Sequence, residues 1–258
     1  MRRSGGSLLL VLSLLTAAAT PGRAQDTLAV MRHLLAMDVS RVHPYHRAYD
    51  MLVHGRDSTV LIGQRDVTLA ESTYAGAPAW LVVETRTGVV PSVESLYVAT
   101  DLRLIHWMSA LGDARVGAEF AGDSIYGAAT MQSGKQNLVL GGRPDLVVTS
   151  PMLEALLPLL PLAADWSDSV AVLGVDLTST TIVPAELAVV AEEQLPVDSV
   201  TTLLSWVVAL RTGSRQVLVW IDKQSGVALK VRQALPPHVG TDLEYRLRPE
   251  PASTTPPP

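Results

Sequence analysis

The residues best suited to chemistry lie in WIDKQSGVALKVR, from Trp220 to Arg232, where Asp222, Lys223 and Ser225 place an acid, a base and a hydroxyl within four residues. Acid–base or nucleophilic catalysis would require these groups to converge in a sheltered cleft. The flanking residues alternate between apolar and polar, which is typical of strands, and Gly226 can adopt the positive φ of a tight turn. We therefore predict a hairpin turn and no catalytic residue here.

A second candidate nucleophile is Ser124, in the sequence Gly122-Asp123-Ser124. The three residues are similar to the nucleophile motif of GDS-type esterases, which follows an early strand, enters a helix and has an Asp-x-x-His partner near the C-terminus. Here both flanks alternate as strands, and the chain contains neither Asp-x-x-His nor Gly-x-Ser-x-Gly. We predict a second turn rather than a catalytic serine.

Histidines and carboxylates gather near the start of the chain, with His43 and His46 three residues apart and His54, Asp50 and Asp57 nearby. Two imidazoles at this spacing share a metal ion when the segment is helical. A proline follows His43, and the glutamate of His-Glu-x-x-His is missing. We expect a solvated loop and no metal site.

Asp165 and Asp168 flank Trp166 and raise the question of a carboxylate pair or a calcium site. The ligand spacing and the glycine of a calcium-binding loop are absent, so we predict a polar loop. The chain also has no phosphate-binding glycine loop and no dinucleotide fingerprint, so we expect no cofactor.

The N-terminus has the layout of a secretory signal peptide. Two arginines precede the apolar run from Leu8 to Ala19, and Thr20-Pro-Gly-Arg-Ala24 follows, with small residues before the expected cleavage site. We predict cleavage after Ala24 and export to the periplasm or the medium. The alternative, an uncleaved anchor, is less favoured because the run is shorter than the ~20 residues that a membrane span needs.

Composition restricts the function of the mature chain. Removal of residues 1–24 takes away three of the 20 basic residues and leaves 25 acidic ones, so the formal charge becomes −8. This charge, without a basic cluster, argues against nucleic acid or an anionic membrane surface as a partner. The absence of cysteine excludes disulfides and an N-terminal lipid anchor on cysteine, so burial of apolar side chains must stabilise the fold.

Most of the chain reads as antiparallel strands joined by tight turns. Short segments rich in Val, Leu, Thr, Tyr and Trp alternate with clusters of Gly, Asp, Asn and Ser. The expected strands cover residues 49–53, 59–71, 79–86, 92–99, 102–110, 114–121, 124–132, 135–140, 169–177, 180–193, 200–211, 216–222, 227–233 and 243–247. One domain is expected, although two small ones are compatible with the length.

Two helices are expected beside the strands. A short one follows Asp26 or Thr27, and a second starts at Ser150, which serves as N-cap for Pro151 at the first helical position. The second helix has a broad apolar face, and Pro158 and Pro161 should end it early. The residues of this face are Met152, Leu153, Leu156, Leu157 and Leu160. Such a helix either completes the core or lines a ligand cavity.

The order of these parts resembles the lipoprotein-carrier (LolA/LolB-like) half-barrel superfamily, and more closely its uncharacterised exported members. The resemblance covers about residues 48–248 and rests on that order and on the hairpin Trp220-x-Asp222 to Gly226. It implies an α+β fold in which a strongly curved, mostly antiparallel sheet wraps one or two short apolar helices. With the segments outside it, which are assigned from their own residues, the expected organisation is a signal peptide (1–24), an N-terminal helix and linker (25–47), one half-barrel domain (48–248) and a disordered Pro/Thr tail (249–258).

The leading hypothesis is an exported, non-enzymatic envelope protein that binds a lipid-like ligand, such as a lipid or a lipoprotein acyl chain, in an apolar concavity. Helix leucines and alternating sheet residues would line it: Leu153, Leu156, Leu157, Leu160, Val217, Val219, Val227 and Leu229. The alternative is a structural or protein-interaction module with a fully packed core. A third hypothesis, a hydrolase, would need Ser124 or the pair His43 and His46 in a cleft.

Overall fold

The computed structural model describes residues 37, 39–89, 91–122, 124–131, 134–141, 147–175, 180–197, 200–213, 215–236 and 239–249. The predicted signal peptide, the first predicted helix and the tail from residue 250 onward lie outside the described residues.

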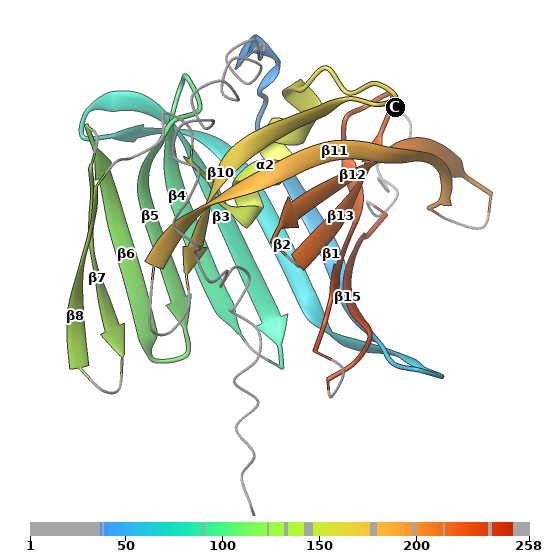
Figure 1. Cartoon of the computed structure of the whole chain (residues 1–258), viewed down its shortest axis with the longest axis horizontal. Helices are drawn as coiled ribbons and strands as arrows, with labels where there is room; N and C mark the ends of the chain where they lie inside the picture. Colours follow the sequence, from blue (N-terminus) through green and yellow to red (C-terminus); the bar gives the residue numbers. More distant parts are fainter. Residues whose placement is uncertain are drawn as a thin grey trace, which may run out of the picture.

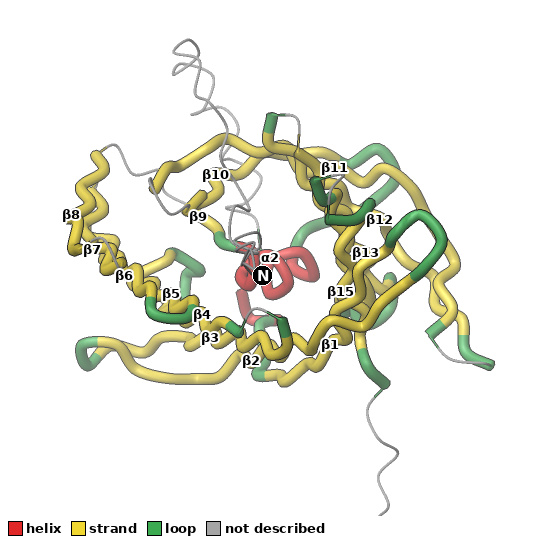
Figure 2. Tube along the Cα trace, turned by 90° about the horizontal axis from the view of Figure 1, so that it is seen from below, coloured by secondary structure: helices red, strands yellow, loops and turns green. Residues whose placement is uncertain are grey.

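In the described part of the chain, fifteen strands form one curved sheet around a short helix (Figures 1 and 2). The strands are β1 (Tyr45–His54), β2 (Thr59–Tyr74), β3 (Ala77–Gly88), β4 (Ser92–Ala99), β5 (Leu104–Leu111), β6 (Ala114–Ala121), β7 (Ser124–Met131), β8 (Gly134–Gly141), β9 (Val147–Val148), β10 (Ser167–Val175), β11 (Thr180–Pro196), β12 (Thr202–Thr212), β13 (Arg215–Asp222), β14 (Ala228–Ala234) and β15 (Asp242–Leu247). The helical elements are η2 (Val39–Arg41), α2 (Ser150–Leu156) and η3 (Leu157–Leu159).

The sheet consists of two meanders joined by strands from opposite ends of the chain. The strand order runs from β8 down to β1 and then from β15 down to β9. Neighbouring strands are antiparallel except β9 and β10, and the two meanders meet where Tyr49 pairs with Leu247. Among the described residues the sheet is not closed, because β8 and β9 end the strand order. The predicted fold class is confirmed, and every strand except the two-residue β9 was predicted.

Helix α2 and η3 lie inside the curve of the sheet (Figure 2). Their leucines are almost fully buried, as in Leu156 and Leu157 with 2% and 1% of their surface exposed. Pro151 lies in the first turn as predicted, but the N-cap is Thr149 rather than Ser150. The helix ends at Leu156, before Pro158, because a proline in the helix interior removes a hydrogen bond and clashes with the preceding turn.

The hairpin between β13 and β14 shows one departure from the predicted pattern. A β-bulge after Trp220 places Ile221 opposite Ala228, while Val219 pairs with Val231. Ala228 therefore occupies the core position expected for Val227 or Leu229. Because of the bulge, Leu229 no longer follows the inward-facing alternation of β14. Its side chain is buried, but it lies outside the core cluster.

Asp222, Lys223 and Ser225 belong to the turn of this hairpin, as predicted. The Asp222 carboxylate accepts hydrogen bonds from the backbone N–H and the hydroxyl of Ser225 at 2.8 Å and 2.5 Å. Lys223 pairs with Glu192 at 2.6 Å and lies over the Trp206 ring. Local contacts thus account for all three side chains, because they form the turn and attach it to β11 and β12.

Gly226 is required at this turn for two reasons. Its φ is +72°, and a Cβ there would lie 2.8 Å from the Cβ of Pro158. We expect Gly226→Ala to lower the free energy of unfolding by about 2–3 kcal/mol, from backbone strain and the clash together. Gly112→Ala is the matched control, because Gly112 has φ +54° and open space at its Cβ. If urea denaturation gave the same loss in free energy of unfolding for both variants, contact with Pro158 would be unimportant.

Candidate functional site

The candidate functional site is the contact between α2 and the inner face of β2, β3 and β4. A small apolar pocket of about 10 Å³ lies there, close to the smallest space that holds one water molecule. Its lining is entirely apolar in character: Val42, Leu69, Trp80, Val82, Val98, Leu102, Met152, Ala155 and Leu156. The sheet contributes rigid walls, while Met152 contributes a flexible side chain that adapts to different shapes.

Leu102, in the turn between β4 and β5, is part of the lining of this pocket. Its φ is +68°, in the left-handed region, and its side chain is 3% exposed. The turn is held by hydrogen bonds from Leu102 N–H to the carbonyl of Ala99 and from Ala99 N–H to the carbonyl of Arg103. A left-handed leucine costs about 1–2 kcal/mol, and burial of its side chain offsets this cost. The turn therefore inserts Leu102 into the pocket under backbone strain.

A cluster of buried charges lies on the same inner face and contacts α2. Glu154, the charged residue of the helix, forms an ion pair with Arg65 of β2. Arg65 also donates to Glu84 of β3 at 2.6 Å, and Glu84 pairs with Arg86. The Tyr49 hydroxyl donates to Glu154 at 3.0 Å. These side chains are at most 5% exposed, so the ion pairs fix the position of α2 on the sheet in a low-dielectric environment.

The buried groups hold one another in their charged forms. Burial alone would lower the pKa of Arg65, but Glu154 and Glu84 outweigh it and raise that pKa well above its usual value. Burial would likewise raise the pKa of Glu84, yet Arg65 and Arg86 lower it. Removal of Arg65 would consequently leave Glu154 buried without its cationic partner.

Glu94 of β4 adjoins the cluster of buried charges, but its pKa is shifted in the opposite direction to that of Glu84. It lies directly opposite Glu84 in the β3–β4 register and accepts a hydrogen bond from the Trp107 indole at 2.8 Å. Burial, and then the charge of Glu84, raise the pKa of Glu94 to about 7, although Arg86 opposes the shift. The inner face thus carries a carboxyl group that titrates near neutral pH.

Several donors near the cluster have no hydrogen-bond partner among the described residues: the hydroxyls of Tyr45 and Tyr245, Nε of Arg65 and Arg86, and Nη1 of Arg47. The guanidinium of Arg47 lies 3.9 Å from the centroid of the Tyr45 ring. Unpartnered buried donors are costly, so these positions favour water or a ligand that can accept hydrogen bonds.

Comparisons with known proteins give little beyond this geometry. No family model matches the chain, and no curated protein matches it. A search of solved structures finds a β-barrel-like protein of the domain of unknown function DUF1849 from Brucella abortus, with a TM-score of 0.49 and 9% identity over 80% of this chain and 96% of that chain.

The residues predicted to line a cavity separate into three groups. Leu156 lines the pocket. Leu153, Leu157, Leu160 and Val219 belong to the packed core, and Val217 packs against it. Val227 and Leu229 lie at the bulged hairpin, outside that core cluster.

The structure does not bring together the histidines that were considered for a metal site, and the expected solvated loop is wrong for His46, which lies in strand β1. His46 pairs with Asp66 at 3.3 Å, while His54 contacts Thr59 at 2.9 Å and Glu244 at 3.2 Å. Among the described residues, no three His, Asp or Glu side chains are arranged to hold a metal ion. Ser124 is the first residue of β7, in register with Ala121 across a turn.

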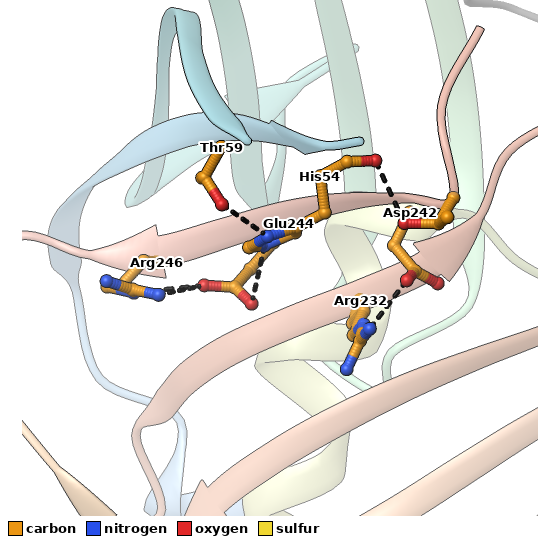
Figure 3. A network of polar contacts seen from close by, with 7 residues as sticks. His54, Thr59, Arg232, Asp242, Glu244 and Arg246 are labelled. Atoms are coloured by element: carbon orange, nitrogen blue, oxygen red, sulfur yellow. Dashed lines mark hydrogen bonds and ion pairs between the residues drawn. The ribbon is translucent and has the colours of Figure 1, made fainter. Parts of the chain in front are cut away.

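His54 belongs instead to a polar network on β1, β14 and β15 (Figure 3). Arg246 donates two hydrogen bonds to Glu244, at 2.6 Å and 2.9 Å, and Arg232 pairs with Asp242 at 2.5 Å. These pairs join β14, β15 and β1 across the boundary between the two meanders. The network therefore stabilises the junction of the sheet.

Sequence reasoning missed the buried charges, although a signal for them exists. Arg65 is in phase with Val67 and Leu69 along β2, and Glu84 is in phase with Val82 along β3. A charged residue in the apolar phase of a strand predicts a buried ion pair or a functional group. In β3 the signal is weak, because Leu81 and Val83 make the opposite face apolar too.

Within the described part of the chain, no helix is long and apolar enough to cross a membrane.

Proposed function

We propose that this chain is an exported, non-enzymatic binding protein of the cell envelope, which holds a lipid-like ligand between α2 and the inner face of the curved sheet. The apolar pocket, lined in part by Leu102 with its positive φ, is the observation that carries the proposal. The resemblance to the lipoprotein-carrier superfamily and the predicted signal peptide support the envelope location.

The pocket can be widened at modest cost. Withdrawal of Leu102 loses about 1.5–3 kcal/mol of burial and releases about 1–2 kcal/mol of backbone strain, so the net cost is on the order of 1 kcal/mol. Removal of α2 would instead expose several buried leucines at about 1.5–3 kcal/mol each, comparable to the whole stability of a domain. We therefore place ligand entry at the β4–β5 turn and keep α2 in position.

Leu102→Gly tests this proposal. Glycine adopts φ +68° without strain and leaves the pocket open, so we expect about fivefold tighter binding of a fluorescent fatty acid to the delipidated variant. Ala75→Gly is the matched control, because Ala75 also has a positive φ (49°) but lies in the exposed turn between β2 and β3. The proposal fails if neither wild type nor Leu102→Gly binds the probe and mass spectrometry finds no lipid in natively purified wild-type protein.

A second candidate function is a protein-interaction module. Apolar side chains on the outer face of β5, β7 and β8 favour it, since Met108, Tyr126 and Val139 are 48%, 52% and 69% exposed. Strand β8 also ends the strand order, and an edge strand offers unpaired backbone groups to a partner. Cross-linking from position 139 in intact cells would favour this function if it captured one defined protein while the fatty-acid probe failed to bind.

A further inference from the structure

The donors beside the apolar pocket indicate which kind of lipid-like ligand fits, an inference that rests on the proposed function. We propose that the ligand is an amphiphile with a carboxylate head, and that the head binds to the Tyr45 hydroxyl and the Arg47 guanidinium while the chain enters the pocket.

The two donors and the pocket are neighbours in the sheet. Tyr45 of β1 pairs with Leu69 of β2, and Leu69 is part of the pocket wall. Arg47 pairs with Val67, two residues from Leu69 on the same face of β2. On the helix side, Ala155 of the pocket follows Glu154 of the charge cluster. An apolar space thus borders directly on a polar one, which is the arrangement that an amphiphile requires.

Tyr45 is held as a hydrogen-bond donor. Burial, and then the nearby charge of Glu154, raise the pKa of its hydroxyl above the usual value, so the phenol stays protonated. The hydroxyl oxygen is buried and has no hydrogen-bond partner among the described residues. A ligand oxygen that accepts this hydrogen bond would satisfy it.

Arg47 supplies the positive charge. No salt bridge joins it to a carboxylate in the described part of the chain, in contrast to Arg65 and Arg86, and its buried Nη1 has no hydrogen-bond partner there. Its guanidinium stacks on the Tyr45 ring, which keeps it beside the hydroxyl. Arg47 is therefore the arginine of this face that is available to an external anion.

The surrounding charges favour a single negative charge on the head. Glu154 and Glu84 act electrostatically on Tyr45 and are opposed by Arg47 and Arg65; Arg65 is paired with both carboxylates, which leaves the single charge of Arg47 for the head. A dianionic phosphate would be repelled by these carboxylates more strongly than a carboxylate would be. A neutral head would leave the Arg47 charge without a counter-ion, and hydrogen bonds to charged groups contribute about 1.5–3 kcal/mol.

The test compares dodecanoic acid with 1-dodecanol in displacing a fluorescent fatty acid from the delipidated full-length protein. We expect the acid to bind at least tenfold more tightly than the alcohol. Arg47→Met should remove that preference while the affinity for the alcohol stays unchanged. This substitution strands no carboxylate, so the variant should fold. Tyr45→Phe, which keeps the ring and loses the hydroxyl, should weaken binding of the acid severalfold.

Arg115→Met, a change at an exposed arginine of β6, is the control and should retain the full preference for the acid. Equal affinity for acid and alcohol would overturn the carboxylate assignment and leave the proposed function standing. An unchanged acid preference in Arg47→Met would overturn the assignment of the head to Arg47. If neither compound bound any of these proteins, the proposed function itself would fail.

Discussion

Replacement of Arg65 by methionine is expected to lower the free energy of unfolding by about 3–5 kcal/mol. Arg65 is 1% exposed and bridges Glu154 of α2 to Glu84 of β3. Methionine fills a similar volume but leaves Glu154 without its arginine and Glu84 with Arg86 alone. Breaking a buried ion pair from one side is costly because the remaining charge has neither water nor a partner.

Urea denaturation followed by circular dichroism would measure this loss. Arg103→Met is the matched control, because Arg103 pairs with Asp101 in a bridge in which both side chains are more than half exposed, and its loss should be within about 0.5 kcal/mol. Glu154→Leu in the Arg65→Met background should cost less than the sum of the two single changes, since the pair acts as a unit. A loss below about 1 kcal/mol for Arg65→Met would contradict the view that these ion pairs hold α2 in place.

The second large effect concerns Glu94 and the pH dependence of stability. Its pKa is about 7 in the folded protein and about 4.5 when exposed. The folded state therefore binds the proton more tightly than the unfolded state does. The stabilising contribution is complete below pH 4.5, falls as the pH rises towards 7 and is lost above it. The difference corresponds to at most about 3 kcal/mol, and the partial exposure of the Glu94 side chain reduces it.

Glu94→Gln isolates this contribution, because glutamine keeps an oxygen for the Trp107 indole but does not ionise. We expect the stability of the variant relative to wild type to rise by about 1–3 kcal/mol between pH 5 and pH 8. Comparison with wild type cancels the contributions of groups that the two proteins share, while Glu84, whose pKa is lowered, contributes its slope below this pH range. The exposed Glu71→Gln is the control and should parallel wild type. Parallel curves for Glu94→Gln and wild type would show that Glu94 does not titrate in this range.

The strand pattern was predictable because each strand carries its own signal in short-range alternation and in its turns. The turn at Asp222 to Gly226, the paired strands on either side of it and the proline-ended helix follow from local rules. The register of that hairpin was not predictable, since a single bulged residue changes which side chains point inward and has no distinct sequence signature. Hence Ala228 took the place predicted for Leu229 or Val227.

The sequence by itself determined an antiparallel sheet of short strands with an apolar helix inside it, because alternation, turn residues and proline act over a few positions. Only the tertiary structure decided that β1 pairs with β15, that Glu154 meets Arg65 at a sequence separation of 89 residues, and that Tyr45 and Arg47 border an apolar pocket. Those juxtapositions depend on how the sheet curves and where its two halves meet. Long-range packing specifies that arrangement, and it leaves no local trace in the order of the residues.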